Sequence, residues 1–237
     1  MRAPRMIFRR RDAPRPSTDG AFLRAADGAL STTAARIMSG ASRLAVIVAR
    51  AGDETLCCGA LIHAAARGGA RVDVICLTQG EETMRARHDE TADALACLAP
   101  DATLHWIGEP EKTLPARGRH FDMLARRLQP LIAPEATVLL PWPGEPCVDL
   151  ARGHALGRAA MAADRAALCY LAEARFLPKA QVPHGLRLLT APPASIAAKR
   201  RAMSQHSGRC GELAASGRTP PAMLEHFLQH PELYLPG

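Results

Sequence analysis

Residues 50 to 54, with the sequence Arg-Ala-Gly-Asp-Glu, place one guanidinium and two carboxylates directly after an apolar stretch. These groups could bind a polar ligand, or the two acids could cap a helix and favour its dipole. Residues 50 to 54 are therefore the first place to look for a functional site.

The segment around residues 50 to 54 must be positioned by the elements on either side of it. Leu44 to Ala49 is an apolar run of strand length, and Glu54 to Arg67 has helical composition that ends at two glycines. Val72 to Thr78 predicts a second strand. Two parallel strands joined by one helix form a right-handed crossover, and ligands of such folds bind at the carboxyl ends of the strands.

Strands and helices alternate along the rest of the chain. Further strands are expected at 103–107, 137–140, 168–173 and 186–191, and helices at 83–98, 119–132, 150–164, 193–215 and 221–230. Such alternation is typical of a sheet covered by helices on both faces. We therefore expect an α/β fold, a Rossmann-like three-layer sandwich with a mainly parallel sheet.

The positive charge of the chain is unevenly placed. The formal net charge is +7, and residues 1 to 16 hold six arginines and one aspartate, which leaves +2 for the rest. Without a basic stripe or interleaved aromatic residues, the body is not expected to bind nucleic acid. We expect residues 1–40 to form a flexible basic arm and residues 41–237 to form one domain.

Neither the cysteines nor the apolar segments suggest secretion or a membrane. The seven cysteines are odd in number and lack the spacing of a cysteine zinc site, which favours reduced thiols in the cytoplasm. Cys57 and Cys58 are expected to pack within their helix. No apolar run reaches the roughly 20 residues of a membrane span.

Several segments at the strand ends have the order and spacing of a known family. They are Arg50-Ala51-Gly52-Asp53-Glu54-Thr55, Leu77-Thr78-Gln79-Gly80-Glu81, Arg87 with Glu90, Gly108-Glu109-Pro110-Glu111, Trp142 to Leu150, and Lys199 with Ala202, His206 and Ser207. From about residue 43 onward the chain resembles the PIG-L/LmbE-like zinc deacetylases. This family removes N-acetyl groups from N-acetylglucosaminyl and related sugar conjugates, so the resemblance implies an LmbE-like fold and a carbon–nitrogen (amide) hydrolase lineage.

The resemblance also implies a zinc site, of which this sequence keeps little. The family's three ligand positions correspond to Arg50, Asp53 and Leu150, and only Asp53 can bind a metal. The general-base position is Gly52. The acid position is Cys147, and the aspartate that orients the acid is retained as Asp149. We therefore expect that zinc, the family cofactor, is not bound here.

Two functions follow from this comparison. The chain is expected to be an inactive member of the lineage that binds a small sugar conjugate, or another anionic or carbonyl ligand, or serves as a partner protein. The alternative is an active N-deacetylase with a rewired metal site built from Asp53, Cys147, Asp149 or His154, the last lying one helical turn after Leu150. Glu54 and His206 complete the expected pocket.

Arg50 leads to the sharpest structural expectation. Asp53 and Asp149 would be costly to bury without a counter-charge or hydrogen bonds. A guanidinium presents forked donors that suit a carboxylate. We expect Arg50 to occupy the place of the metal, to pair with Asp53 and to reach toward Asp149, unless it points into solvent.

Overall fold

The computed structural model describes residues 29–79, 84–176, 183, 185–206 and 221–236. Within them the fold is built on one sheet of eight strands, in the order β1-β7-β8-β6-β5-β2-β3-β4. The strands are β1 (Leu30–Thr32), β2 (Arg43–Val48), β3 (Arg71–Thr78), β4 (Thr103–Glu109), β5 (Thr137–Pro141), β6 (Leu168–Tyr170), β7 (Arg187–Leu189) and β8 (Leu233–Pro236). Only β8 runs antiparallel to its neighbours, so the expected mainly parallel sheet is confirmed.

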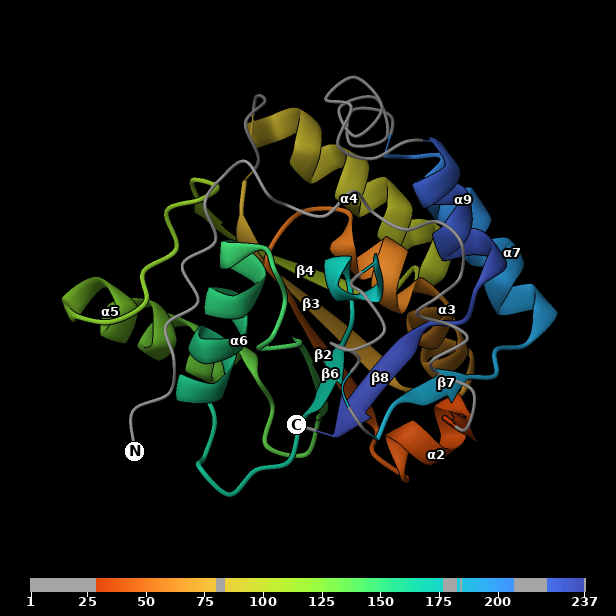
Figure 1. Ribbon diagram of the computed structural model, residues 1–237, viewed down its shortest axis with the longest axis horizontal. Helices are drawn as coiled ribbons and strands as arrows, with labels where there is room; N and C mark the ends of the chain where they lie inside the picture. The colour runs from red at the N-terminus through yellow and green to blue at the C-terminus, as the bar shows by residue number, and fades with distance from the viewer. Residues whose placement is uncertain (1–28, 80–83, 177–182, 184, 207–220, 237) are drawn as a thin grey trace.

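Helices cover both faces of the sheet (Figure 1). They are α2 (Ala34–Met38), α3 (Asp53–Arg67), α4 (Met84–Leu98), α5 (Arg119–Leu128), α6 (Val148–Ala159), α7 (Pro193–Met203) and α9 (Pro221–Gln229), with short 3-10 helices η1 (Gln129–Leu131) and η2 (Glu173–Phe176). In Figure 1, α5 and α6 lie to the left of the sheet, α3, α7 and α9 lie to the right, and α4 runs across the top of the view. The expected three-layer α/β architecture is confirmed.

The alternation of side chains in β2 explains why separate hydrophobic clusters form on its two faces. Leu44, Val46 and Val48 pack on the side of α3, whereas Ala45 and Ile47 pack on the side of α5 and α6. Successive residues of a strand point to opposite faces, so a strand buried on both faces must be apolar throughout. This is why the run from residue 44 to residue 48 predicts a central strand.

The order of the strands determines where a ligand can bind. After β2 the chain crosses to β3 on one side, whereas β5 pairs with β2 on the other side. Open α/β sheets bind ligands at such a reversal point, outside the carboxyl ends of the strands. The loops that follow β2 and β5 carry Arg50 and Cys147, respectively, so the two candidate segments meet where the fold favours a site.

The ends of the chain differ from the expectation. The expected arm at residues 1–40 overlaps β1, which pairs with β7, and α2, which buries Ile37 and Met38. β1 and β8 are three and four residues long, too short for a periodic signal. The helix expected over 193–215 ends at Met203, and the part of it after residue 206 lies outside the described residues.

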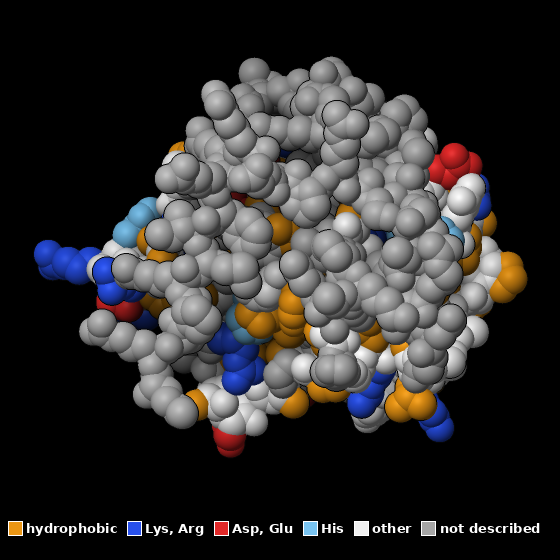
Figure 2. Space-filling model, in the orientation of Figure 1, with side chains coloured by type: hydrophobic (Ala, Val, Ile, Leu, Met, Phe, Trp, Pro, Cys, Tyr) orange, Lys and Arg blue, Asp and Glu red, His pale blue; other side chains and the backbone are white. Residues whose placement is uncertain are grey.

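Surface charge, helix hydropathy and cysteines can be stated for the described residues. On the face shown in Figure 2, the Lys and Arg side chains that are drawn lie in separate places rather than in one stripe. Among the described residues, no helix is both long and apolar enough to cross a membrane. The six cysteines in this part of the chain form no disulfide.

Candidate functional site

A tight turn between β2 and α3 brings the first segment to the sheet edge. Gly52 is the residue before α3 and has φ of 93°, in the left-handed region that favours glycine. Its carbonyl accepts the hydrogen bond from Leu56 N that begins the helix, at 2.9 Å. The glycine at the base position therefore has a conformational role, because the turn requires it.

The guanidinium of Arg50 forms ion pairs with two acids. Its Nε and Nη2 donate to the two carboxylate oxygens of Asp53, each at 3.2 Å, and its Nη1 donates to Glu173 Oε1 at 2.7 Å. The exposed fractions of the side chains are 13% for Arg50, 2% for Asp53 and 42% for Glu173. The expected pairing of Arg50 with Asp53 is confirmed, in the forked geometry that guanidinium and carboxylate favour.

Burial and the neighbouring charges have opposite effects on the pKa of Arg50. Burial by itself lowers the pKa of this side chain, but Asp53, Glu173 and Cys147 outweigh it, and the pKa of Arg50 lies well above its ordinary value. Arg50 is therefore a permanent cation at the carboxyl edge of the sheet.

Cys147 joins the second segment to the first. It precedes α6, and its Sγ accepts a long contact of 3.7 Å from Arg50 Nη1. Burial raises the pKa of the Cys147 thiol, and Arg50 opposes this change. The structure thus brings Arg50, Asp53 and Cys147 together, although they come from two loops almost 100 residues apart.

Asp149 is directed to a different partner than we expected. Its Oδ2 accepts a hydrogen bond of 2.6 Å from the backbone N–H of Lys112, in the loop after β4. Lys112 has φ of 65°, a conformation that is uncommon for residues other than glycine. Arg50 donates to Asp53, Cys147 and Glu173, and the expected contact with Asp149 is not among its hydrogen bonds.

Glu54 and His206 lie together beneath the turn. The fully buried carboxylate of Glu54 accepts from Gly52 N at 2.8 Å and from Thr55 Oγ1 at 2.8 Å, and it lies 3.0 Å from His206 Nε2. Burial acts to raise the pKa of Glu54, but the hydrogen bond and charge of His206 outweigh it and lower the pKa. These contacts hold the turn between β2 and α3 in its conformation. Glu54 and His206 therefore support the site by positioning this turn.

His154 is not brought to the candidate site. Its Nδ1 lies 2.9 Å from the carbonyl oxygen of Pro141 and 3.8 Å from Cys169 Sγ, and burial lowers its pKa. Among the described residues, no group of three or more His, Cys, Asp or Glu side chains could hold a metal ion. The rewired set of Asp53, Cys147, Asp149 and His154 is therefore not assembled as a metal site.

A zinc ion does not fit the residues at the family's ligand positions. Leu150 has no donor atom and is fully buried in the core on the α3 side. Arg50 has no free lone pair, and both oxygens of Asp53 already accept hydrogen bonds from it. A bound metal would have to displace a guanidinium that carries the same sign of charge.

Sequence reasoning missed Glu173 and Glu145. The buried carboxyl group of Glu145 accepts from Ala172 N at 2.6 Å and from Ala174 N at 2.8 Å, on the two sides of Glu173. Burial raises the pKa of Glu145 to about 8. Glu173 follows β6, the neighbour of β5, whereas the expected strand ran to residue 173 and so placed this glutamate inside the strand.

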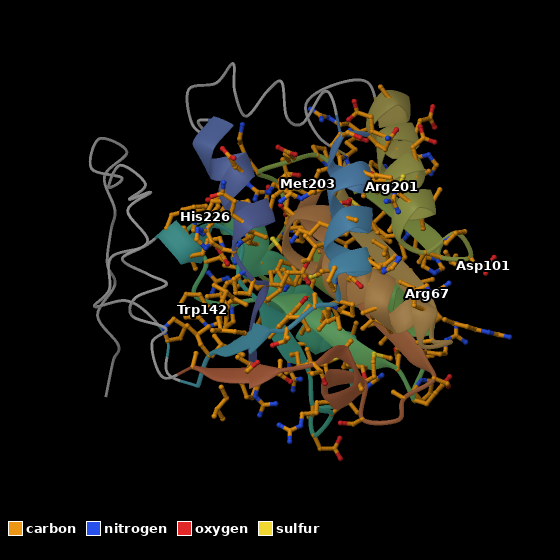
Figure 3. The ribbon with its side chains drawn as sticks, turned by 90° about the vertical axis from the view of Figure 1, so that its right-hand side faces the viewer. Arg67, Asp101, Trp142, Arg201, Met203 and His226 are labelled. Atoms are coloured by element: carbon orange, nitrogen blue, oxygen red, sulfur yellow. The ribbon has the colours of Figure 1, made fainter. Side chains whose placement is uncertain are left out.

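The described residues also line a cavity far from this site. It has a volume of about 700 Å³ and lies between the last turns of α3 and α4 and the start of β3, lined in part by Arg67, Arg71 and Asp101. Figure 3 shows Arg67 and Asp101 on one side and Trp142, from the loop after β5, on the other. None of the predicted site residues lines this cavity.

Comparison with known proteins shows which solved structures share this fold. No protein-family model matches the sequence, and no curated protein does. Among solved structures the chain is similar to deacetylases of the LmbE/PIG-L type. The fold expected from the sequence resemblance is therefore confirmed: the chain adopts the LmbE-like deacetylase fold.

Three solved structures illustrate the likeness. An N,N'-diacetylchitobiose deacetylase from Pyrococcus horikoshii is 13% identical with a TM-score of 0.62, over 85% of this chain and 86% of that one. A teicoplanin deacetylase is 18% identical with a TM-score of 0.60, over 82% and 97%. A 4-carboxy-2-hydroxymuconate hydratase from Pseudomonas putida is 16% identical with a TM-score of 0.57, over 79% and 83%.

Proposed function

We propose that this chain is a ligand-binding protein on the deacetylase fold and that it does not act as a zinc hydrolase. The observation that carries the proposal is the forked pair between Arg50 and Asp53, the one retained ligand position. A guanidinium there offers a fixed positive charge and hydrogen-bond donors in place of a Lewis acid. Such a site suits an anionic or carbonyl group of a small molecule.

The ligand we propose is a sugar conjugate or a related small molecule with an anionic or carbonyl group. The lineage supports the sugar, because solved deacetylases of this fold act on diacetylchitobiose and teicoplanin by name. The hydratase of the same fold is named for a carboxylated substrate. A fold does not fix a chemistry, and Arg50 favours the anionic group.

Loss of hydrolysis has a physical reason at each position. Zinc acidifies the attacking water and polarises the amide carbonyl, and a general base contributes about 10²–10⁴ to the rate. Here the base position is Gly52, and the acid position is the thiol of Cys147, whose pKa is raised by burial. We expect no N-acetyl hydrolysis above background on N-acetylglucosamine conjugates, with or without added zinc.

Metal content tests the proposal directly. The protein purified without chelators should carry far less than one zinc per chain by elemental analysis. The triple variant Arg50→His, Gly52→Asp and Leu150→His restores the ligands and the base, and we expect it to bind zinc. Gly52 has φ of 93°, so an aspartate there is strained, although aspartate adopts left-handed conformations more readily than most non-glycine residues.

A matched control separates the site from a stray histidine. Arg36→His changes an exposed arginine of α2 that has no His, Cys, Asp or Glu one helical turn away, and should leave the zinc content unchanged. Stoichiometric zinc in the wild-type protein would refute the proposal, because a metal and the guanidinium of Arg50 cannot share one place. Zinc-stimulated hydrolysis that Asp53→Ala abolishes would refute it as well.

A further inference from the structure

The two ion pairs of Arg50 differ in their exposure to solvent. The pair with Asp53 uses two hydrogen bonds, and the side chain of Asp53 is 2% exposed. The pair with Glu173 uses one hydrogen bond, from Nη1, and the side chain of Glu173 is 42% exposed. A buried forked pair is held firmly, whereas a solvent-exposed carboxylate exchanges readily. The outer side of the guanidinium is therefore the part that another anion can reach.

Glu173 is held in place through its backbone. The carboxyl group of Glu145 accepts hydrogen bonds from the N–H groups of Ala172 and Ala174, the residues before and after Glu173. In the described part of the chain, the side chain of Glu173 forms its hydrogen bond with Arg50 alone. The side chain can thus leave Arg50 by rotating about its own bonds, without unfolding the start of η2.

We propose that Glu173 is a built-in substitute for an anionic group of the ligand, and that a ligand carboxylate displaces it from Arg50 Nη1. This inference rests on the proposed function, because it requires Arg50 to be the binding group. The exchange replaces one carboxylate by another, so the charge around Arg50 is preserved. A neutral sugar gains nothing from this exchange.

The carboxylate of Asp149 indicates which other chemical groups the ligand carries. Asp149 is 2% exposed, and its Oδ1 is buried without a hydrogen-bond partner among the described residues. It lies in the first turn of α6, two residues after Cys147, which contacts the same Nη1 of Arg50. A buried acceptor without a donor is costly. A hydroxyl or amide N–H on the ligand would supply one, so the class we infer is a carboxylated sugar with free hydroxyl or N-acyl groups.

The start of α6 adds to the preference for an anion. This helix of 12 residues has the acid Asp149 in its first turn, and the backbone N–H groups of Asp149 and Leu150 act to lower the pKa of the Cys147 thiol, against its burial. The N–H groups of the first turn carry a partial positive charge that favours an anion nearby. The helix end and the guanidinium therefore act in the same direction on a ligand carboxylate.

A pair of probes that differ in one carboxylate tests the inference. N-acetylmuramic acid carries a lactyl carboxylate that N-acetylglucosamine lacks, and calorimetric titration compares their affinities for the wild-type protein and Glu173→Gln. We expect the acid to bind more tightly than the neutral sugar. If Glu173 covers Arg50 about nine-tenths of the time, its removal tightens binding of the acid about tenfold. The affinity for the neutral sugar should stay within about twofold, since it does not compete with Glu173.

A matched variant and a spectroscopic readout complete the experiment. Glu135→Gln changes another exposed glutamate that lies 3.9 Å from an arginine, Arg43, and should leave both affinities unchanged. In the wild-type protein the acid should also shift the Nε–H resonance of Arg50, assigned by its loss in Arg50→Lys. This signal reports on the guanidinium itself and does not depend on catalysis.

Each outcome bears on the inference. An acid affinity that Glu173→Gln leaves unchanged or weakens would overturn it, as would the absence of measurable binding of the acid to both proteins. Zinc content separates this failure from that of the proposed function. Stoichiometric zinc in the wild type refutes both, whereas a zinc-free protein with unchanged acid affinity refutes only the role of Glu173.

Discussion

Glu232 is the residue whose substitution should reveal most about the energetics of this fold. Its buried carboxylate accepts hydrogen bonds from Lys199 Nζ at 2.8 Å, Tyr234 OH at 2.8 Å, Ala60 N at 2.7 Å and Leu61 N at 3.1 Å. The Lys199 and Glu232 side chains are each 2% exposed. One acid therefore neutralises a buried lysine and links α3, α7 and β8.

The cost of Glu232→Gln follows from these contacts. The substitution keeps the shape of the side chain but removes its charge and one acceptor. Leaving a buried charge without its partner costs about 3–5 kcal/mol, and an unsatisfied backbone N–H adds about 1–3 kcal/mol. We expect the free energy of unfolding to fall by at least about 4 kcal/mol, which corresponds to a melting temperature lower by about 8–16 °C for a chain of this size.

Urea unfolding of four proteins measures the pair itself. They are the wild type, Glu232→Gln, Lys199→Met and the double variant. Because the double variant leaves no unpaired charge, its loss should be smaller than the sum of the single losses by about 1–3 kcal/mol. Glu135→Gln, at a side chain that is 54% exposed, should change stability by less than about 0.5 kcal/mol. Additive losses, or a loss below about 1 kcal/mol for Glu232→Gln, would refute the reasoning.

Three further outcomes follow from the structure. The pKa of Glu145 is raised from 4.5 to about 8, so between these values the folded chain keeps a proton that the unfolded chain has lost. The contribution of Glu145 to the free energy of unfolding should therefore fall by up to about 1.4 kcal/mol per pH unit as pH rises through this window, and it should be constant above it. Urea unfolding of Glu145→Gln should not show this slope. Gly157→Ala would place a Cβ against Leu140 Cδ2. We expect a loss of about 1–3 kcal/mol in the same assay, and a neutral result would show that Leu140 repacks freely. A chain that starts at residue 34 loses β1 and should melt below one that starts at residue 29, because β1 pairs with β7; equal melting temperatures would show that this edge strand adds no stability.

The centre of the fold could be predicted from local patterns. The apolar run before Arg50 and the one before Trp142 mark β2 and β5, whose side chains are buried on both faces. Because both strands are parallel, the polar residues after them must share one sheet edge. The pairing of Arg50 with Asp53 follows from their close spacing across a single turn. These are local or topological constraints, and a sequence expresses them directly.

The parts that escaped prediction depend on contacts distant in sequence. β8 gains its hydrogen bonds from β6 and β7, so its four residues show little pattern of their own. Arg50 was expected to reach toward Asp149, but Asp149 accepts a hydrogen bond from the backbone N–H of Lys112, and nothing in the sequence marks the left-handed backbone of that lysine. Glu173 reaches Arg50 across more than 120 residues. Spacing cannot reveal such partners, because they are chosen by the tertiary fold.

The position of β8 has a consequence for how the chain is made. It follows every other described element along the sequence, but in the sheet it lies between β6 and β7, and β1 is attached through β7 alone. At about 5–20 residues per second, a ribosome needs roughly 10–40 s to proceed from β1 to β8. During this interval β1 has no completed sheet to join. A chaperone that shields apolar segments should therefore contact the nascent chain until residues 233–236 emerge.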